Sequence, residues 1–391
     1  MRKPLKELLA EEENVAFIRE NLQKDYTKLL LKYSDNEDKR SLIEQIAQKQ
    51  RIRKKLPSYY QNPRLILPPS LNLAQASSEE TAQVKRDWLK AAQSMADLSA
   101  GLGIDCSILA AMFNEVIYVE PNPDLLKIAR HNFKVLGLDQ VVFHQAKAEE
   151  FLKDMPKVDL IYLDPSRRDE GEQSLIEVEN YQPNLLEVIN LIKAKSQSLL
   201  VKLSPMISIP HYLKELSGVS EVWVISQRNE CKEVCFYWNF NVPSSLKIRT
   251  INLHPKQDQY YENLVGSEAI VKTSPILHYL YLPNASILKA GLQDHVAKEF
   301  NLGKLAPNTH LYSSADLISD YPGRVFKVLQ TLKPYHSHFR KGTYNIISRN
   351  FPEDGAFIAN KLKIKKSHHK QHLIACQANE EYVFIEADLV L

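Results

Sequence analysis

The chain has 391 residues, which at roughly 150 residues per domain predicts two to four domains. Hydrophobic residues make up 44% of the chain, and no apolar run reaches the roughly 18 residues of a membrane-spanning helix, so no membrane segment is predicted. Four scattered cysteines exclude a disulfide scaffold and predict a reducing, cytoplasmic location.

The formal net charge of +3 hides an uneven distribution of charge along the chain. Residues 97–240 contain 21 acidic and 14 basic side chains, whereas residues 321–372 contain 2 acidic and 11 basic ones. A basic region attached to a less basic body is typical of proteins that bind polyanions, although a basic run can also be a solvated face. Charge alone leaves both interpretations open.

Residues 1–75 are predicted to form a helical N-terminal domain followed by a proline-containing linker. The Ser77–Glu80 spacing of a capping box predicts the start of a helix that continues to Trp88. Strands and helices then alternate up to residue 241. Strands are predicted at 95–98, 116–119, 141–144, 158–163, 198–203, 219–225 and 234–240, with helices at 124–136 and 184–194.

This alternation predicts an α/β fold with a Rossmann-like, doubly wound parallel sheet. The last two strands have no helix between them and should be antiparallel. After residue 241 the pattern changes to small α+β domains, with predicted boundaries at 242–318 and 319–391.

The segment from Met95 to Asp105 reads as a strand, a tight loop with two glycines and a helix capped by Asp105. Gly101 and Gly103 would allow backbone conformations closed to other residues and the close approach of a ligand. Two glycines after a strand also fit a plain turn between a strand and a helix. The loop therefore predicts a nucleotide-like ligand only together with residues further along the chain.

Glu120 stands 19 residues after Gly101, at the end of the second strand, where a carboxylate can accept hydrogen bonds from both ribose hydroxyls. Enzymes that bind NAD and enzymes that bind S-adenosyl-L-methionine (AdoMet) share this feature. Cys106 occupies the position of the third glycine of a dinucleotide-binding loop. Asp97 would repel a pyrophosphate but suits the cationic groups of AdoMet. The sequence therefore favours AdoMet.

A fourth strand ends in Asp164-Pro-Ser-Arg-Arg168, at the edge where a doubly wound sheet binds its ligand. With this motif the chain resembles the class I AdoMet-dependent methyltransferases. Residues 97–105 resemble their first motif, Glu120 their ribose-binding acid, Ala148-Glu149 their adenine-contacting segment and 164–167 their fourth motif.

The resemblance implies a methyltransferase domain at residues 76–241. It also implies that AdoMet is held by Asp97, Ser99, Ala100, Gly101, Gly103, Asp105, Glu120, Pro121, Asn122, Ala148, Glu149 and Asp164.

The fourth motif departs from that of amino-group methyltransferases, because Ser166 and Arg167 replace a proline and a base-stacking aromatic residue. Asp-Pro-x-Arg is closer to RNA uracil-C5 enzymes, but Ser204 stands where those have a nucleophilic cysteine. We therefore expect Asp164 to orient or deprotonate an acceptor amine or ring nitrogen, while Arg167 and Arg168 hold a phosphate or polarise a carbonyl. Alternatively, the arginines pair with neighbouring acidic residues.

Residues 312–326, 350–352 and 362–365 are similar to a THUMP-like domain that follows a ferredoxin-like module in an uncharacterised family of bacterial methyltransferases. THUMP domains present RNA to an attached enzyme, so the resemblance implies tRNA or rRNA as a partner. The sequence thus predicts an RNA base methyltransferase with no covalent cysteine intermediate and no metal site. The alternatives are methylation of a protein or small molecule, and a non-catalytic RNA-binding protein that binds AdoMet.

Overall fold

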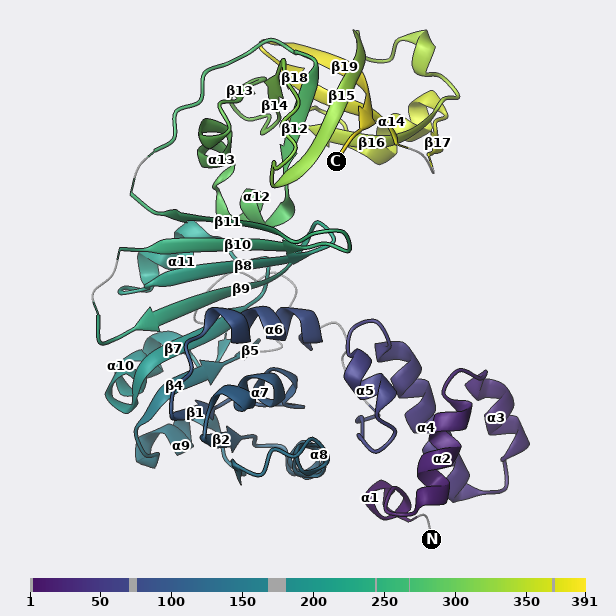
Figure 1. Ribbon diagram of the computed structural model, residues 1–391, viewed down its shortest axis with the longest axis vertical. Helices are drawn as coiled ribbons and strands as arrows, with labels where there is room; N and C mark the ends of the chain where they lie inside the picture. Colours follow the sequence, from purple (N-terminus) through teal and green to yellow (C-terminus); the bar gives the residue numbers. More distant parts are fainter. Residues whose placement is uncertain (1–2, 70–75, 168–180, 243–244, 267, 368–369) are drawn as a thin grey trace. The chain divides into compact units, whose positions relative to one another are not determined.

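The computed structural model describes residues 3–69, 76–167, 181–242, 245–266, 268–367 and 370–391 (Figure 1). The chain divides into two compact units. The first unit comprises residues 1–220 and 235–244, and the second comprises residues 221–234 and 245–391. Among the described residues, no helix has both the length and the apolar character that crossing a bilayer requires.

The first unit begins with five helices (Figure 1). The first four contribute to a core of aliphatic side chains. The Asp25 side chain caps the third helix by accepting the backbone N–H of Thr27 at 2.9 Å, and Asn36 caps the fourth in the same way. The helices are α1 (Leu5–Leu8), α2 (Glu12–Asn21), α3 (Tyr26–Lys32), α4 (Glu37–Ile52) and α5 (Pro57–Gln61).

The proline-containing segment after α5 is attached to the strand-and-helix part of the same unit. Asn132 on helix α8 (Pro123–Val135) accepts the backbone N–H of Ile66 at 2.8 Å and donates to its carbonyl at 2.9 Å. Leu65 and Leu67 pack in one hydrophobic cluster with Leu102 and Ile104 beside the glycine loop. The N-terminal helices therefore share a core with the region that carries the predicted ligand site.

The central sheet has nine strands in the order β11-β10-β8-β9-β7-β4-β1-β2-β3. The pairs β3–β2, β2–β1, β1–β4 and β4–β7 are parallel, as are β8 and β10. The predicted α/β fold class with a large parallel sheet is confirmed. The strands are β1 (Ser94–Asp97), β2 (Glu115–Val119), β3 (Val141–His144), β4 (Val158–Leu163), β7 (Ser196–Leu203), β8 (Glu221–Gln227), β9 (Glu230–Asn239), β10 (Lys247–Leu253) and β11 (Gln259–Leu264).

A two-residue turn joins β8 to β9, which are neighbours in the sheet. Arg228 and Asn229 both have positive φ angles, 52° and 61°, as a tight antiparallel hairpin requires. The expected antiparallel pair is therefore present. The helices that precede or connect these strands in the first unit are α6 (Glu79–Trp88), α7 (Ile104–Leu109), α8, α9 (Ala148–Asp154), α10 (Leu185–Lys195) and α11 (Ile209–Glu215).

Two predicted helix caps are wrong. Helix α6 begins one residue later than expected, and its capping box joins Ser78 and Thr81 rather than Ser77 and Glu80. Helix α7 has Gly103 as its N-cap and receives no side-chain cap, so Asp105 does not cap it. Ser77 and Asp105, the two residues predicted to cap these helices, belong instead to a buried polar cluster.

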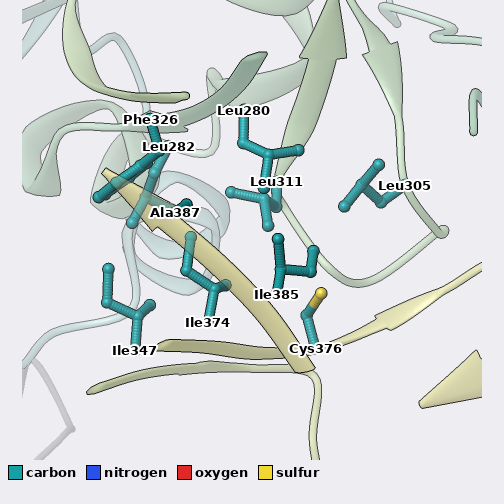
Figure 2. Packing of buried hydrophobic residues seen from close by; sticks show 10 residues of the cluster. All are labelled: Leu280, Leu282, Leu305, Leu311, Phe326, Ile347, Ile374, Cys376, Ile385 and Ala387. Atoms are coloured by element: carbon teal, nitrogen blue, oxygen red, sulfur yellow. The ribbon is translucent and has the colours of Figure 1, made fainter. Parts of the chain in front are cut away.

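The second unit contains an eight-stranded sheet in the order β13-β14-β12-β15-β19-β18-β16-β17. One face carries ten buried hydrophobic residues, among them Phe326, Ile374 and Ile385 (Figure 2). Its elements are β12 (Tyr279–Pro283), α12 (Ala285–Ala290), α13 (Gln293–Glu299), β13 (Gly303–Lys304), β14 (Tyr312–Ser314), β15 (Gly323–Leu332), β16 (Thr343–Arg349), α14 (Gly355–Leu362), β17 (Lys365–Lys366), β18 (Gln371–Ala378) and β19 (Glu381–Leu389).

Candidate functional site

The carboxyl ends of three adjacent parallel strands carry the predicted acidic residues. Asp97 ends β1, Glu120 follows the last residue of β2, and Asp164 follows the last residue of β4. Because β2, β1 and β4 are neighbours in that order, their carboxyl ends lie along one edge of the sheet. Parallel α/β sheets bind their ligands at this edge.

The two glycines of the loop after β1 have different environments. Both have left-handed backbones, with φ of +58° at Gly101 and +76° at Gly103. A Cβ atom on Gly103 would lie 2.8 Å from the rings of Tyr118 and Phe133, whereas one on Gly101 would approach nothing closer than the Ser99 carbonyl oxygen at 4.0 Å. Gly103 therefore permits packing within the protein, and Gly101 leaves open space next to the backbone.

Glu120 ties the second strand to the glycine loop. One carboxylate oxygen accepts the backbone N–H of Gly101 at 2.9 Å, and the other accepts the backbone N–H of Asn122 at 2.8 Å. Burial raises the pKa of Glu120, and these two hydrogen bonds oppose that rise. A carboxylate oxygen can accept a further hydrogen bond, so the side chain can receive two hydroxyl donors without leaving this position.

Ser99 connects the ends of β1 and β4. Its backbone N–H donates to Asp97 at 3.0 Å, and its hydroxyl oxygen accepts the backbone N–H of Asp164 at 2.5 Å. Asp97 is 1% exposed, and burial raises its pKa to about 8, with the negative charges of Asp105 and Asp164 contributing to the rise. A buried carboxyl with a raised pKa would be stabilised in its ionised form by a cationic ligand group.

Asp105 lies in a buried cluster of charges. Its carboxylate lies 2.7 Å from the Lys85 ammonium and accepts the hydroxyls of Ser77 at 2.6 Å and Tyr162 at 2.8 Å. Burial alone would raise the pKa of Asp105, but Lys85 and Lys202 outweigh it and lower that pKa well below its usual range. In this structure the Asp105 carboxylate is therefore engaged by protein groups.

Lys202 joins this cluster to Asp164. Its ammonium lies 2.5 Å from Asp164 Oδ2, 2.9 Å from Ser77 Oγ and 3.5 Å from Asp105 Oδ2. Lys202 is not part of any motif in the sequence. The available signal was a single charge inside the apolar run Leu199-Leu-Val-Lys-Leu203, because a lysine in a buried strand requires an anionic partner.

The remaining predicted residues occupy separate positions. Pro121 and Asn122 are exposed, and Asn122 caps α8 through its side chain; Ala148 and Glu149 begin α9. Arg167 lies in the short strand β5 (Ser166–Arg167), paired with β6 (Tyr181–Gln182), and Arg168 falls outside the described residues. No group of His, Cys, Asp and Glu among the described residues is arranged to hold a metal ion.

The donor and acceptor set of this edge fits AdoMet. The buried Glu120 carboxylate suits a ribose, and Asp97 offers a buried carboxyl to a cationic amino or sulfonium group. The loop at Gly101 leaves space beside the backbone, and its φ of +58° suits a glycine.

Comparison with known proteins supports this fold over the whole chain. A family of ferredoxin-like domains matches residues 279–322, a range that overlaps the region 242–318 where the sequence predicts such a module and extends beyond its end. A crystal structure from Porphyromonas gingivalis W83, described as a presumptive methyltransferase, is 26% identical and superposes with a TM-score of 0.85, covering 100% of both chains.

A structure of M. capricolum TrmK with S-adenosyl-homocysteine is 14% identical, and the match covers 42% of this chain and 69% of the TrmK chain. Its TM-score of 0.33 is too low for a conclusion about this chain. None of the curated proteins matches this chain. The chain therefore shares its fold, from end to end, with the P. gingivalis protein, and it contains a ferredoxin-like domain in its second unit.

Proposed function

We propose that this protein is an AdoMet-dependent methyltransferase that modifies a base in tRNA or rRNA. The observation that carries the proposal is the grouping of Asp97, Glu120 and Asp164 at one edge of the parallel sheet, joined through Ser99 and Gly101. The fold shared with the P. gingivalis protein supports the same activity.

The residues have distinct roles in this proposal. Glu120 accepts hydrogen bonds from the ribose hydroxyls, and Asp97 receives the cationic end of the cofactor. AdoMet supplies an electrophilic methyl group when it is bound. Asp164 accepts a hydrogen bond from the acceptor and orients it for attack, because its side chain is 38% exposed while the backbone around it is fixed by Ser99.

The proposal of RNA as the substrate rests on the C-terminal part of the second unit. Lys361, Lys363, Lys365 and Lys366 are exposed on and beside α14 and β17, and the resemblance to a THUMP-like domain covers these residues. Lysines that neutralise phosphates supply most of the sequence-independent affinity for nucleic acids.

The decisive experiment is mass spectrometry of nucleosides from the total RNA of a deletion strain. We expect one methylated base to be missing, to return with the wild-type gene and to stay missing with Asp164→Asn. A normal set of methylated nucleosides in the deletion strain, with AdoMet binding intact in vitro, would contradict RNA as the substrate. The protein would then methylate a protein or small molecule, or bind AdoMet without catalysis.

RNA contact has a separate test in the salt dependence of binding. For a duplex RNA, log Kd should rise with log salt with a slope of about 0.9 per neutralised phosphate, by analogy with duplex DNA. Replacing Lys363, Lys365 and Lys366 together by Gln should reduce that slope. An affinity that does not change with salt would contradict an electrostatic RNA interface.

A further inference from the structure

We propose that Lys202 is a positioning residue that holds the Asp164 carboxylate in one orientation, so that the acceptor must present a proton-bearing group to it. The inference rests on the proposed methyltransferase function and narrows its substrate class. It concerns the pair formed by Lys202 and Asp164 and the cluster behind it.

The sheet places Lys202 directly beside Asp164. In the parallel pair of β4 and β7, Leu163 is the register partner of Val201, so the next residues along the two strands are Asp164 and Lys202. The ammonium of Lys202 lies 2.5 Å from Asp164 Oδ2, and the lysine side chain is 7% exposed. A contact set by strand register, rather than by a flexible surface side chain, holds the carboxylate in one orientation.

The cluster behind Lys202 fixes the lysine in turn. Ser77 Oγ lies 2.9 Å from the Lys202 ammonium and donates its own proton to Asp105 at 2.6 Å. Asp105 is also held by Tyr162 and by Lys85, which is fully buried. Lys202 therefore lies between two carboxylates, one enclosed in the protein and one at the edge of the sheet.

The charge on Lys202 has a defined effect on Asp164. The pKa of Asp164 lies above its usual value, because desolvation by the surrounding protein and the charge of Asp105 raise it more than Lys202, and to a lesser extent Lys85, lower it. An ionised carboxylate can only accept hydrogen bonds, so a group that docks on it must donate one. An N–H or O–H group of the acceptor meets this requirement, and Asp164 can take the proton that such a group releases.

Lys85 provides a matched control because its ammonium contacts the same Asp105 and lowers the pKa of Asp164 less than Lys202 does. Both lysines are buried and both lower the pKa of Asp105. A purely structural role for Lys202 predicts that the loss of either ammonium has the same consequences. A positioning role predicts a larger change at Asp164 when Lys202 is replaced than when Lys85 is replaced.

The test is a carbon-13 carboxyl NMR titration of the full chain, with the Asp164 signal assigned from Asp164→Asn. In Lys202→Met the pKa of Asp164 should rise by about 1 to 3 pH units, as expected for the loss of an adjacent opposite charge. Lys202→Arg, which keeps the charge, should restore most of the wild-type value, and Lys85→Met should give a clearly smaller rise. Equal rises in Lys202→Met and Lys85→Met, or none in either, would overturn the proposal.

Lys202→Gln replaces Lys202→Met in this comparison if the apolar variant does not fold, because glutamine keeps a hydrogen-bond donor but no charge. Methyl transfer to RNA of the deletion strain gives a second readout: the acidic limb of the pH–rate profile should move to higher pH, with the affinity for S-adenosyl-homocysteine changed less than threefold. If wild type methylates no RNA but the titration shows the predicted rise, the RNA assignment fails and the role of Lys202 stands.

Discussion

A cluster of buried charges in the first unit contrasts with a cluster of buried hydrophobic side chains in the second. The first unit encloses Lys85, Asp105 and Lys202, and both lysines contact the Asp105 carboxylate. The second unit encloses a cluster of ten hydrophobic residues on one face of its sheet (Figure 2). Buried ion pairs contribute little net stability because desolvation offsets their attraction, whereas buried hydrocarbon stabilises in proportion to its area. We infer that the charged cluster serves the site and the apolar cluster serves the fold.

The largest effect expected from this comparison is in the apolar cluster. Phe326 is fully buried, and Phe326→Ala should lower the free energy of unfolding by about 3–5 kcal/mol through lost burial and a cavity. Hydrogen exchange should show lost protection in β12, β15 and β19, while the affinity for S-adenosyl-homocysteine stays constant. A parallel loss of that affinity would show that the apolar cluster also serves the site.

Glu120→Gln should weaken AdoMet binding by about 1.5–3 kcal/mol, roughly 10- to 150-fold, because the ribose loses hydrogen bonds to a charged acceptor. The exposed Glu115, at the other end of the same strand, provides the control. Calorimetry should find Glu115→Gln indistinguishable from wild type. Equal AdoMet affinities of wild type and Glu120→Gln would show that Glu120 does not bind the ribose.

Asp97→Asn should stabilise the unliganded protein at alkaline pH while it weakens AdoMet binding. The pKa of Asp97 is raised to about 8 in the folded protein, so the folded state binds its proton more tightly than the unfolded state. Stability from this group is therefore present at low pH and is lost as pH rises from about 4 to 8. Thermal unfolding at pH 9 should show a gain of at least about 1.4 kcal/mol, the equivalent of one pH unit. The gain should shrink toward pH 5, and a constant difference would contradict the raised pKa.

The smallest effect should come from trimming the apolar cluster by one methyl group. Ile374 is fully buried, and Ile374→Val should cost about 0.5–1.5 kcal/mol in denaturant unfolding. The change should leave AdoMet affinity and its pH dependence unaltered. A shift in either property would show that the apolar cluster also influences the ligand site.

The sequence predicted the strands of the first unit well because their apolar runs are short and regularly spaced. Two of them, Val141–His144 and Val158–Leu163, have the predicted bounds. It did not predict that β10 and β11 belong to the large sheet, because the pairing of β10 with β8 joins residues 26 positions apart, as Lys247 with Glu221. Pairing of this kind is set by tertiary structure, not by local periodicity.

The candidate site was predictable where a residue's role depends on its place at a strand end. Asp97, Glu120 and Asp164 follow this rule, and the structure brings them to one edge. The cluster around Asp105 was not predictable, because Lys202 is 97 residues away in the sequence. Its place in an apolar run indicates only that it needs an anionic partner, and the fold shows that two lysines share one aspartate.

The different surroundings of Gly101 and Gly103 have a consequence for how the loop tolerates variation. In a saturation library sorted first for soluble expression and then for AdoMet capture, substitutions at 103 should be depleted in the first sort, because any Cβ collides with Tyr118 and Phe133. Asn or Asp at 101, which accept a left-handed backbone, should survive that sort and be depleted only in the second. The two glycines of one motif would then be required for different reasons, Gly103 for folding and Gly101 for ligand binding.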